Sequence, residues 1–242
     1  MTKTLYIIHG WTYSTEPWAK TIKLLNDKYH IKVEMLNVPG LTDPSKKIWN
    51  IKEYVKWADS LIPDGAIALG HSNGGRILMN LLVKKSQKLS HLILLDAAGV
   101  YEPSRKRDIL KKLSRILSPL KQIRPLRKIL HKIIGASDYE RAPENMKKTL
   151  SNMLESDKDL DYTKIEVKTD ILWGEMDKIT PVRQAKKLHA GIKGSRIKIF
   201  PNWTHAPYIA DPEGLARAIS QVLKDKNSEK TLFSRSSREL PY

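Results

Sequence analysis

A serine between two glycines is the part of this sequence best suited to chemistry. The segment G-H-S-N-G at residues 70–74 follows the apolar run 66–69 and precedes a stretch of helical periodicity, which is the strand–turn–helix setting of a G-x-S-x-G nucleophile. A strand that turns at once into a helix strains its central residue, and small neighbours, Gly70 and Gly74, leave room for the turn. The spacing predicts that Ser72 presents a lone hydroxyl at the edge of a sheet.

Alternating strands and helices must position this serine. Six short runs rich in Ile, Leu and Val are separated mostly by longer segments with helical spacing, the pattern of βαβ units in a mainly parallel sheet. We therefore expect an α/β fold in which about six strands are flanked by helices. The expected strands are 4–8, 31–38, 66–69, 92–95, 170–173 and 196–200, and the expected helices are 16–28, 46–61, 75–85, 181–190 and 213–223.

One gap between strands is much longer than the others. About seventy residues between Asp96 and Asp170 contain no strand-like run but carry three apolar stripes at helical spacing, near 109–117, 126–134 and 146–154. We interpret residues 101–163 as a helical lid over the carboxyl edge of the sheet. The core then comprises residues 1–100 and 164–223, and the polar residues 224–242 are expected to form a flexible tail.

From residue 3 to about residue 223 the chain resembles the α/β-hydrolase family, in its serine esterase and lipase-like branch. Besides G-x-S-x-G, an early strand ends in His9-Gly10-Trp11, which is similar to the family's H-G-x turn. The resemblance implies an oxyanion hole made by the backbone N–H groups of Trp11 and Asn73. Two such donors would stabilise the negative oxygen of a tetrahedral intermediate.

The same resemblance implies a general base and an acid, in the chain order nucleophile, acid, histidine. His205 follows the last expected strand, where the family places its base. We interpret His30, His71, His91, His131 and His189 as surface or packing residues. The stretch W-G-E-M-D-K-I-T-P at 173–181 looks like the family's W-G-x-x-D-x-x-x-P and points to Asp177, with Glu175 and Asp96 as alternatives.

These residues lead us to expect hydrolysis of a carboxylic ester with an apolar acyl group through an acyl-enzyme. Cleavage of carbon–carbon bonds and acyl transfer to an alcohol use the same residues and stay open, as does a non-catalytic or membrane-surface lipid-binding protein on this fold. The 242 residues hold no cysteine, no H-E-x-x-H, no G-x-x-x-x-G-K-[ST] and no G-x-G-x-x-G, so we expect neither a metal nor another cofactor.

Charge is the clue to partners, because the formal net charge is +17. Residues 101–135 contain eleven Lys or Arg and two acidic residues. This segment could form a solvated outer face, lie on an anionic membrane and admit lipid esters, or dock an acidic carrier protein. Trp18 after His9-Gly10-Trp11 is similar to the start of bacterial pimeloyl-carrier-protein methyl esterases. The basic residues are not interleaved with aromatic residues on which bases could stack, so we do not expect nucleic-acid binding. The N-terminal residues lead us to expect a cytoplasmic protein, at most peripheral to a membrane.

Overall fold

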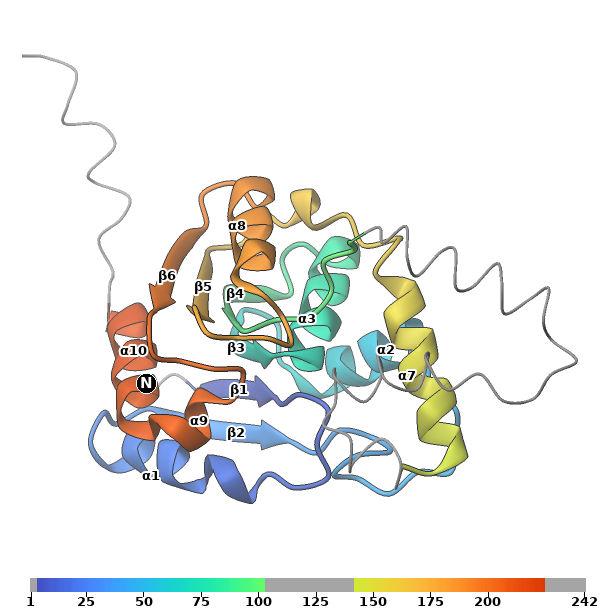
Figure 1. The fold of residues 1–242 in the computed structure, drawn as a ribbon, viewed down its shortest axis with the longest axis horizontal. Helices are drawn as coiled ribbons and strands as arrows, with labels where there is room; N and C mark the ends of the chain where they lie inside the picture. The colour runs from blue at the N-terminus through green and yellow to red at the C-terminus, as the bar shows by residue number, and fades with distance from the viewer. Residues whose placement is uncertain (1–3, 103–141, 225–242) are drawn as a thin grey trace, which may run out of the picture.

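A six-stranded sheet in which every neighbouring pair is parallel organises the protein (Figure 1). The structure is a computed structural model, and it describes residues 4–102 and 142–224. The strand order is β2-β1-β3-β4-β5-β6. The strands are β1 Thr4–Ile8, β2 Lys32–Leu36, β3 Ala66–His71, β4 Leu89–Leu95, β5 Thr169–Gly174 and β6 Arg196–Phe200. The expected α/β fold is confirmed.

Helices cover both faces of the sheet, which explains why its central strands carry continuous apolar runs rather than alternating ones. On one face, α1 (Ala19–Asp27) and α10 (Pro212–Lys224) pack side by side (Figure 1). On the other lie α2 (Ile51–Leu61), α3 (Asn73–Lys84) and α8 (Val182–Gly191). One apolar cluster is buried between the sheet and the helices on each face, and these two clusters hold the strands in place.

Helix starts differ from the expected ones for local reasons. The helix expected from residue 46 begins at Ile51, because the Asn50 side chain accepts from the Glu53 N–H while the Glu53 carboxylate accepts from the Asn50 N–H. This reciprocal capping box satisfies two amides that a helix start leaves unpaired. The helix expected from residue 16 opens with a 3₁₀ turn, η1 (Glu16–Trp18), and two short elements were not expected, η2 (Tyr162–Lys164) and α9 (Pro207–Ala210).

Only the last part of the expected lid lies within the described residues. The third apolar stripe forms α7 (Glu144–Ser156), which buries Met146, Leu150 and Met153. Its Thr149 hydroxyl accepts a hydrogen bond from the Trp49 N–H at 2.9 Å, which joins α7 to the segment before α2. The first two stripes and the expected tail from residue 225 onwards lie outside the described residues. None of the helices described has the length and hydropathy of a membrane span.

Candidate active site

Ser72 stands between β3 and α3 in a strained backbone conformation, with φ +50° and ψ −117°. A positive φ is unfavourable for a residue with a side chain, and such strain persists where surrounding contacts enforce it. Here the Ser72 N–H donates to the Leu95 carbonyl at 3.1 Å, and the Ser72 carbonyl accepts from the Ala98 N–H at 2.9 Å. Both contacts tie the turn to β4 and the residues after it.

The glycines of the turn are required by close approach of the main chain. A Cβ atom on Gly74 would lie 2.0 Å from the carbonyl oxygen of Ile8, and one on Gly70 would lie 2.6 Å from the Cα of Gly75. Backbone atoms of a central sheet cannot move aside by that much. The elbow is therefore pressed against the end of β1, where the next group of functional residues begins.

The turn after β1 is fixed by the buried side chain of His9. Its Nδ1 lies 2.8 Å from the Gly10 carbonyl oxygen and its Nε2 lies 2.8 Å from Thr42 Oγ. A carbonyl only accepts, so Nδ1–H donates to it, and Nε2 accepts from the Thr42 hydroxyl. Burial lowers the pKa of His9, which keeps the ring neutral in this role.

Because a trans peptide points its C=O and its N–H in opposite directions, holding the Gly10 carbonyl also orients the N–H of Trp11. Neither this N–H nor that of Asn73 has a recorded protein acceptor within residues 4–102 and 142–224. Asn73 is the first residue of α3, so no helical carbonyl precedes it. The two expected oxyanion donors are thus both unengaged.

His205 and Asp177 meet, although 28 positions separate them in the chain. His205 Nδ1 lies 2.7 Å from Asp177 Oδ2. Asp177 Oδ2 also accepts from the Thr180 hydroxyl at 2.6 Å, and Oδ1 accepts from the N–H groups of Ile179 and Thr180. Burial raises the pKa of Asp177, but the bonds from His205, Thr180 and Ile179 outweigh it and lower that pKa, which keeps the carboxylate charged.

Ser72 and His205 are not hydrogen-bonded in this structure. No hydrogen bond of the Ser72 hydroxyl is recorded to any of the residues that the structure describes, and the side chain is only partly buried. The hydroxyl is therefore free to rotate. Bonds of this kind are often long or absent before substrate arrives and form in the complex.

The two alternative acids occupy different surroundings. Glu175 is exposed, and its main-chain N–H donates to the Phe200 carbonyl. Asp96 is fully buried, with Oδ1 accepting from the Gly174 N–H at 2.8 Å. Burial raises the pKa of Asp96 well above its usual value, and the nearby charge of Asp177 raises it further. No recorded bond joins either alternative to His205 in the described part of the chain.

His71 and Thr180 belong to the site, and the sequence analysis missed both. His71 was interpreted as a packing or surface residue, but its Nε2 lies 2.7 Å from the main-chain oxygen of His205. Thr180 lies three residues after Asp177, and its hydroxyl donates to the Asp177 carboxylate at 2.6 Å. That spacing was visible in the sequence, whereas nothing local could have paired positions 71 and 205.

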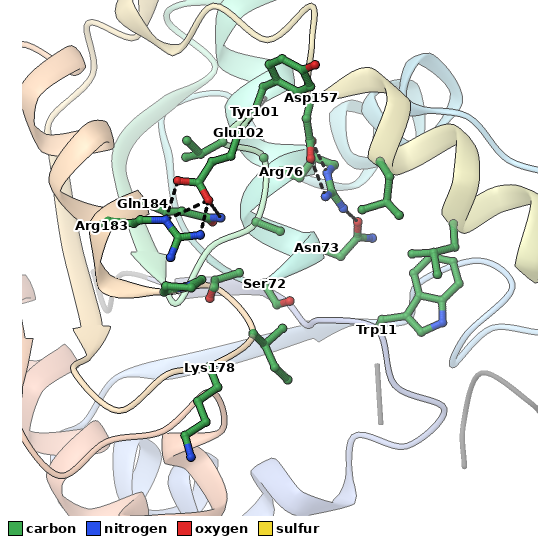
Figure 2. Close-up of a pocket in the computed structure, with 18 residues that line it drawn as sticks. Trp11, Ser72, Asn73, Arg76, Tyr101, Glu102, Asp157, Lys178, Arg183 and Gln184 are labelled. Carbon is green, nitrogen blue, oxygen red and sulfur yellow. Dashed lines mark hydrogen bonds and ion pairs between the residues drawn. The ribbon is translucent and has the colours of Figure 1, made fainter. Parts of the chain in front are cut away.

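A cavity of about 290 Å³ opens beside Ser72 (Figure 2). Apolar side chains line part of it: Trp11, Val100, Leu150, Leu154 and Ile179. Charged side chains line the rest, and four of them form two ion pairs, Glu102 with Arg183 and Arg76 with Asp157, while Lys178 is the fifth. The Glu102 carboxylate accepts from Arg183 at 2.8 Å, and this ion pair lowers the pKa of Glu102 to about 2. The volume is at the lower end for small-molecule pockets, roughly 300–1,000 Å³.

A buried ion pair forms another part of the cavity lining. Arg76 donates from Nε and Nη2 to the two carboxylate oxygens of Asp157, at 2.6 and 3.0 Å, and from Nη1 to the Asn73 side-chain oxygen at 2.6 Å (Figure 2). The Arg76 side chain is 4% exposed and that of Asp157 is 11% exposed. Arg76 lies in the first turn of α3, four residues after Ser72. The pair joins the nucleophile helix to the end of α7.

Comparisons with known proteins agree with this architecture. The family model for the alpha/beta hydrolase fold matches residues 3–118. A pimeloyl-[acyl-carrier protein] methyl ester esterase from Neisseria meningitidis is 27% identical over 235 residues, covering 88% of this chain and 91% of the relative. An uncharacterized hydrolase, YugF, from Bacillus subtilis is 25% identical over 246 residues, covering 92% of this chain and 90% of the relative.

Solved structures share the fold at lower identity. A putative lipase from Acinetobacter baumannii superposes with a TM-score of 0.68 at 19% identity, covering 92% of this chain and 83% of the other. A monoacylglycerol lipase from Paleococcus ferrophilus superposes with a TM-score of 0.65 at 21% identity, covering 92% and 95%. With its parallel sheet, its serine elbow and these relatives, the chain has the α/β-hydrolase fold and is similar in sequence to esterases and other hydrolases of that fold.

Proposed function

We propose that the protein is a serine esterase that cleaves a carboxylic ester through an acyl-enzyme. Ser72 is the nucleophile, His205 the general base and Asp177 the acid that orients it. The N–H groups of Trp11 and Asn73 form the oxyanion hole. The observation that carries the proposal is that Ser72, with its strained backbone and unbonded hydroxyl, lines the same cavity as Trp11 and Asn73, the two residues whose main-chain N–H groups are unengaged.

The reaction follows from the hydrogen bonds of the site. His205 Nδ1–H donates to Asp177, so Nε2 carries the lone pair that takes the Ser72 proton as Oγ attacks the ester carbon. The carbonyl electrons move onto oxygen, where the two amides stabilise the charge by about 3–4 kcal/mol per donor. The C–O bond to the alcohol breaks, and the alcohol leaves with the proton from Nε2. Water then repeats these steps and releases the acid.

The cavity limits the acyl group. Its apolar wall, which includes Leu150 and Leu154, suits an alkyl chain, and about 290 Å³ suits a short or medium one within the described residues. Four of the five charged side chains that line the wall are paired, as Arg76–Asp157 and Glu102–Arg183, so an apolar chain would meet ion pairs along most of the charged part of the wall. We therefore propose an acyl ester of modest length as the substrate.

The carrier of that acyl group is a finer part of the proposal. The relative from N. meningitidis is by name an esterase of an acyl group on a carrier protein. We extend this to the present chain because residues 101–135 are strongly basic, and an acidic carrier would be drawn to them. An anionic membrane would be drawn to the same charges, and the vesicle experiment described in the Discussion separates the two.

Labelling with a fluorophosphonate probe and peptide mapping tests the nucleophile. We expect modification at Ser72, and we expect Ser72→Ala to abolish turnover of p-nitrophenyl butyrate with an unchanged circular dichroism spectrum. A panel of p-nitrophenyl esters from acetyl to palmitoyl gives the chain-length profile. Undiminished turnover by Ser72→Ala would refute the assignment. A wild-type protein that binds lipid but is neither labelled nor active would favour the non-catalytic alternative.

A further inference from the structure

His71 is the last residue of β3, and its side chain is enclosed next to the proposed catalytic groups. The residue is 2% exposed. Three rings surround the imidazole: their centroids lie 4.9 Å away for His205, 5.2 Å for Tyr208 and 5.9 Å for Trp18. The Tyr208 and Trp18 rings meet it edge to face. The His71 ring therefore contacts the proposed base, α9 through Tyr208 and η1 through Trp18.

The polar contact of this ring has a defined direction. Nε2 lies 2.7 Å from the main-chain oxygen of His205, and because a carbonyl only accepts, Nε2 carries the proton. Nδ1 is buried without a partner among the described residues, as expected for the unprotonated nitrogen. Burial, and then the neighbouring His205, lower the pKa of His71 to about 3. The ring stays neutral, and the hydrogen bond persists, throughout the pH range in which an esterase works.

This bond spans 134 positions of the chain and joins the residue before the nucleophile to the main chain of the base. Asp177 holds the other end of His205 through Nδ1, at 2.7 Å. Asp177 thus holds the side chain of His205, and His71 holds its main chain. Without the second contact, the loop 201–206 could shift while the bond to Asp177 was kept.

The turn at residues 9–11, which carries the proposed oxyanion donor of Trp11, packs against the same ring. A Cβ atom on Gly10 would lie 2.9 Å from His71 Nδ1 and 3.0 Å from the Cβ of Ser72. The turn that carries the Trp11 amide therefore packs directly against His71. A single ring contacts the nucleophile elbow, the oxyanion turn and the base loop.

We propose that His71 is a positioning residue, which donates a hydrogen bond to the carbonyl of His205 and so keeps the base in register with the Ser72 hydroxyl. The proposal rests on the proposed function, because it assigns a role in the reaction of Ser72 and His205. His71 itself touches no reacting atom. Its contribution is geometric, and a displacement of about 1 Å at a reacting group costs on the order of 100-fold in rate.

Two variants of matched size separate the hydrogen bond from the volume of the ring. Gln and Met are both unbranched and of equal length, and the terminal amide of Gln places an N–H near the position of Nε2, whereas the methyl of Met cannot donate. We expect His71→Met to have a kcat 10- to 100-fold below that of His71→Gln on p-nitrophenyl butyrate, with KM values within about threefold. Fluorophosphonate labelling should slow by a similar factor.

Several outcomes would overturn the proposal. Equal kcat for the two variants, or a difference confined to KM, would mean that the ring only fills space. Melting temperatures show whether both variants fold. Should neither fold, ¹⁵N NMR of the wild-type histidines decides, because a His71 protonated at Nδ1 is incompatible with the bond. A wild-type enzyme that neither turns over esters nor reacts with the probe would refute the proposed function instead.

Discussion

Replacing Asp177 by Asn tests the acid with the least disturbance of the fold. Asp177 Oδ1 accepts two main-chain N–H groups, at 2.7 and 3.0 Å, so the Asn oxygen must take that position to keep them paired. The Asn NH₂ then lies where Oδ2 stood and donates to His205 Nδ1. The Thr180 hydroxyl retains an acceptor, the Asp96 carbonyl at 3.0 Å. The loop survives, but the donor on His205 is lost.

The consequence is the wrong tautomer of the base. With Nδ1 accepting, the proton of His205 sits on Nε2, the atom that should remove the Ser72 proton. In other triads this change lowers kcat about 10⁴-fold, or about 5.5 kcal/mol of transition-state stabilisation. We expect a loss of that size in kcat for p-nitrophenyl butyrate at pH 8. The melting temperature should stay within a few degrees of the wild type.

Glu175→Gln is the matched control, because it removes the same charge two positions away on an exposed side chain. We expect its kcat to stay within about twofold of the wild type. A loss below tenfold for Asp177→Asn, or an equal loss for Glu175→Gln, would show that the reasoning about the acid is wrong.

Two further predictions concern stability and partners. Folding raises the pKa of Asp96 well above its usual value, so the folded state binds a proton that the unfolded state has lost once the pH is above about 4. The free energy of unfolding therefore falls as the pH rises from about 4 towards the folded pKa. Below about 4 the carboxyl is protonated in both states, and Asp96 costs nothing. Asp96→Asn keeps the acceptor for the Gly174 N–H and removes this cost. The difference in free energy of unfolding between variant and wild type, measured in urea, should therefore grow by about 1.4 kcal/mol for each pH unit in that interval. A difference that is constant between pH 5 and 8 would contradict this prediction. The membrane alternative predicts that the protein binds phosphatidylserine vesicles at low salt and loses binding at 1 M salt. The variant for this test carries Gln at Arg105, Lys106, Arg107, Lys111 and Lys112. Vesicle binding that is independent of salt and unchanged in this variant would reject attraction of the basic segment to an anionic membrane, whereas variant-sensitive binding to an acidic carrier protein alone would support the carrier.

Local patterns predicted most of the fold. The bounds of β1 and β6 agree with the expected strands, because β1 is a short and largely apolar run and β6 alternates charged residues with Ile. The helix before β3 begins five residues later than expected. Periodicity favoured residue 46, but the capping of Asn50 by Glu53 decides the start, and the sequence signature N-x-x-E was present to be read.

The site was predictable to the extent that its parts follow strand ends in a known order. Ser72, Asp177 and His205 each follow a strand of one parallel sheet, so the carboxyl edge brings them to the same region. The contact of His71 with His205 was not predictable, since it depends on how the loop 201–206 packs against the end of β3. The hydroxyl of Ser72 also lacks the expected bond to His205, which no pattern of residue types could reveal.

The ion pair between Arg76 and Asp157 has a consequence for altering which esters the protein accepts. It anchors the end of α7 to the helix that starts at the nucleophile, and breaking such a pair by removing one partner costs on the order of 3–5 kcal/mol. Tilting α7 outward would therefore be an expensive way to accommodate a bulkier acid. Replacing Leu150 or Leu154, which line the cavity from that helix, by a smaller residue enlarges the space and leaves the ion pair intact.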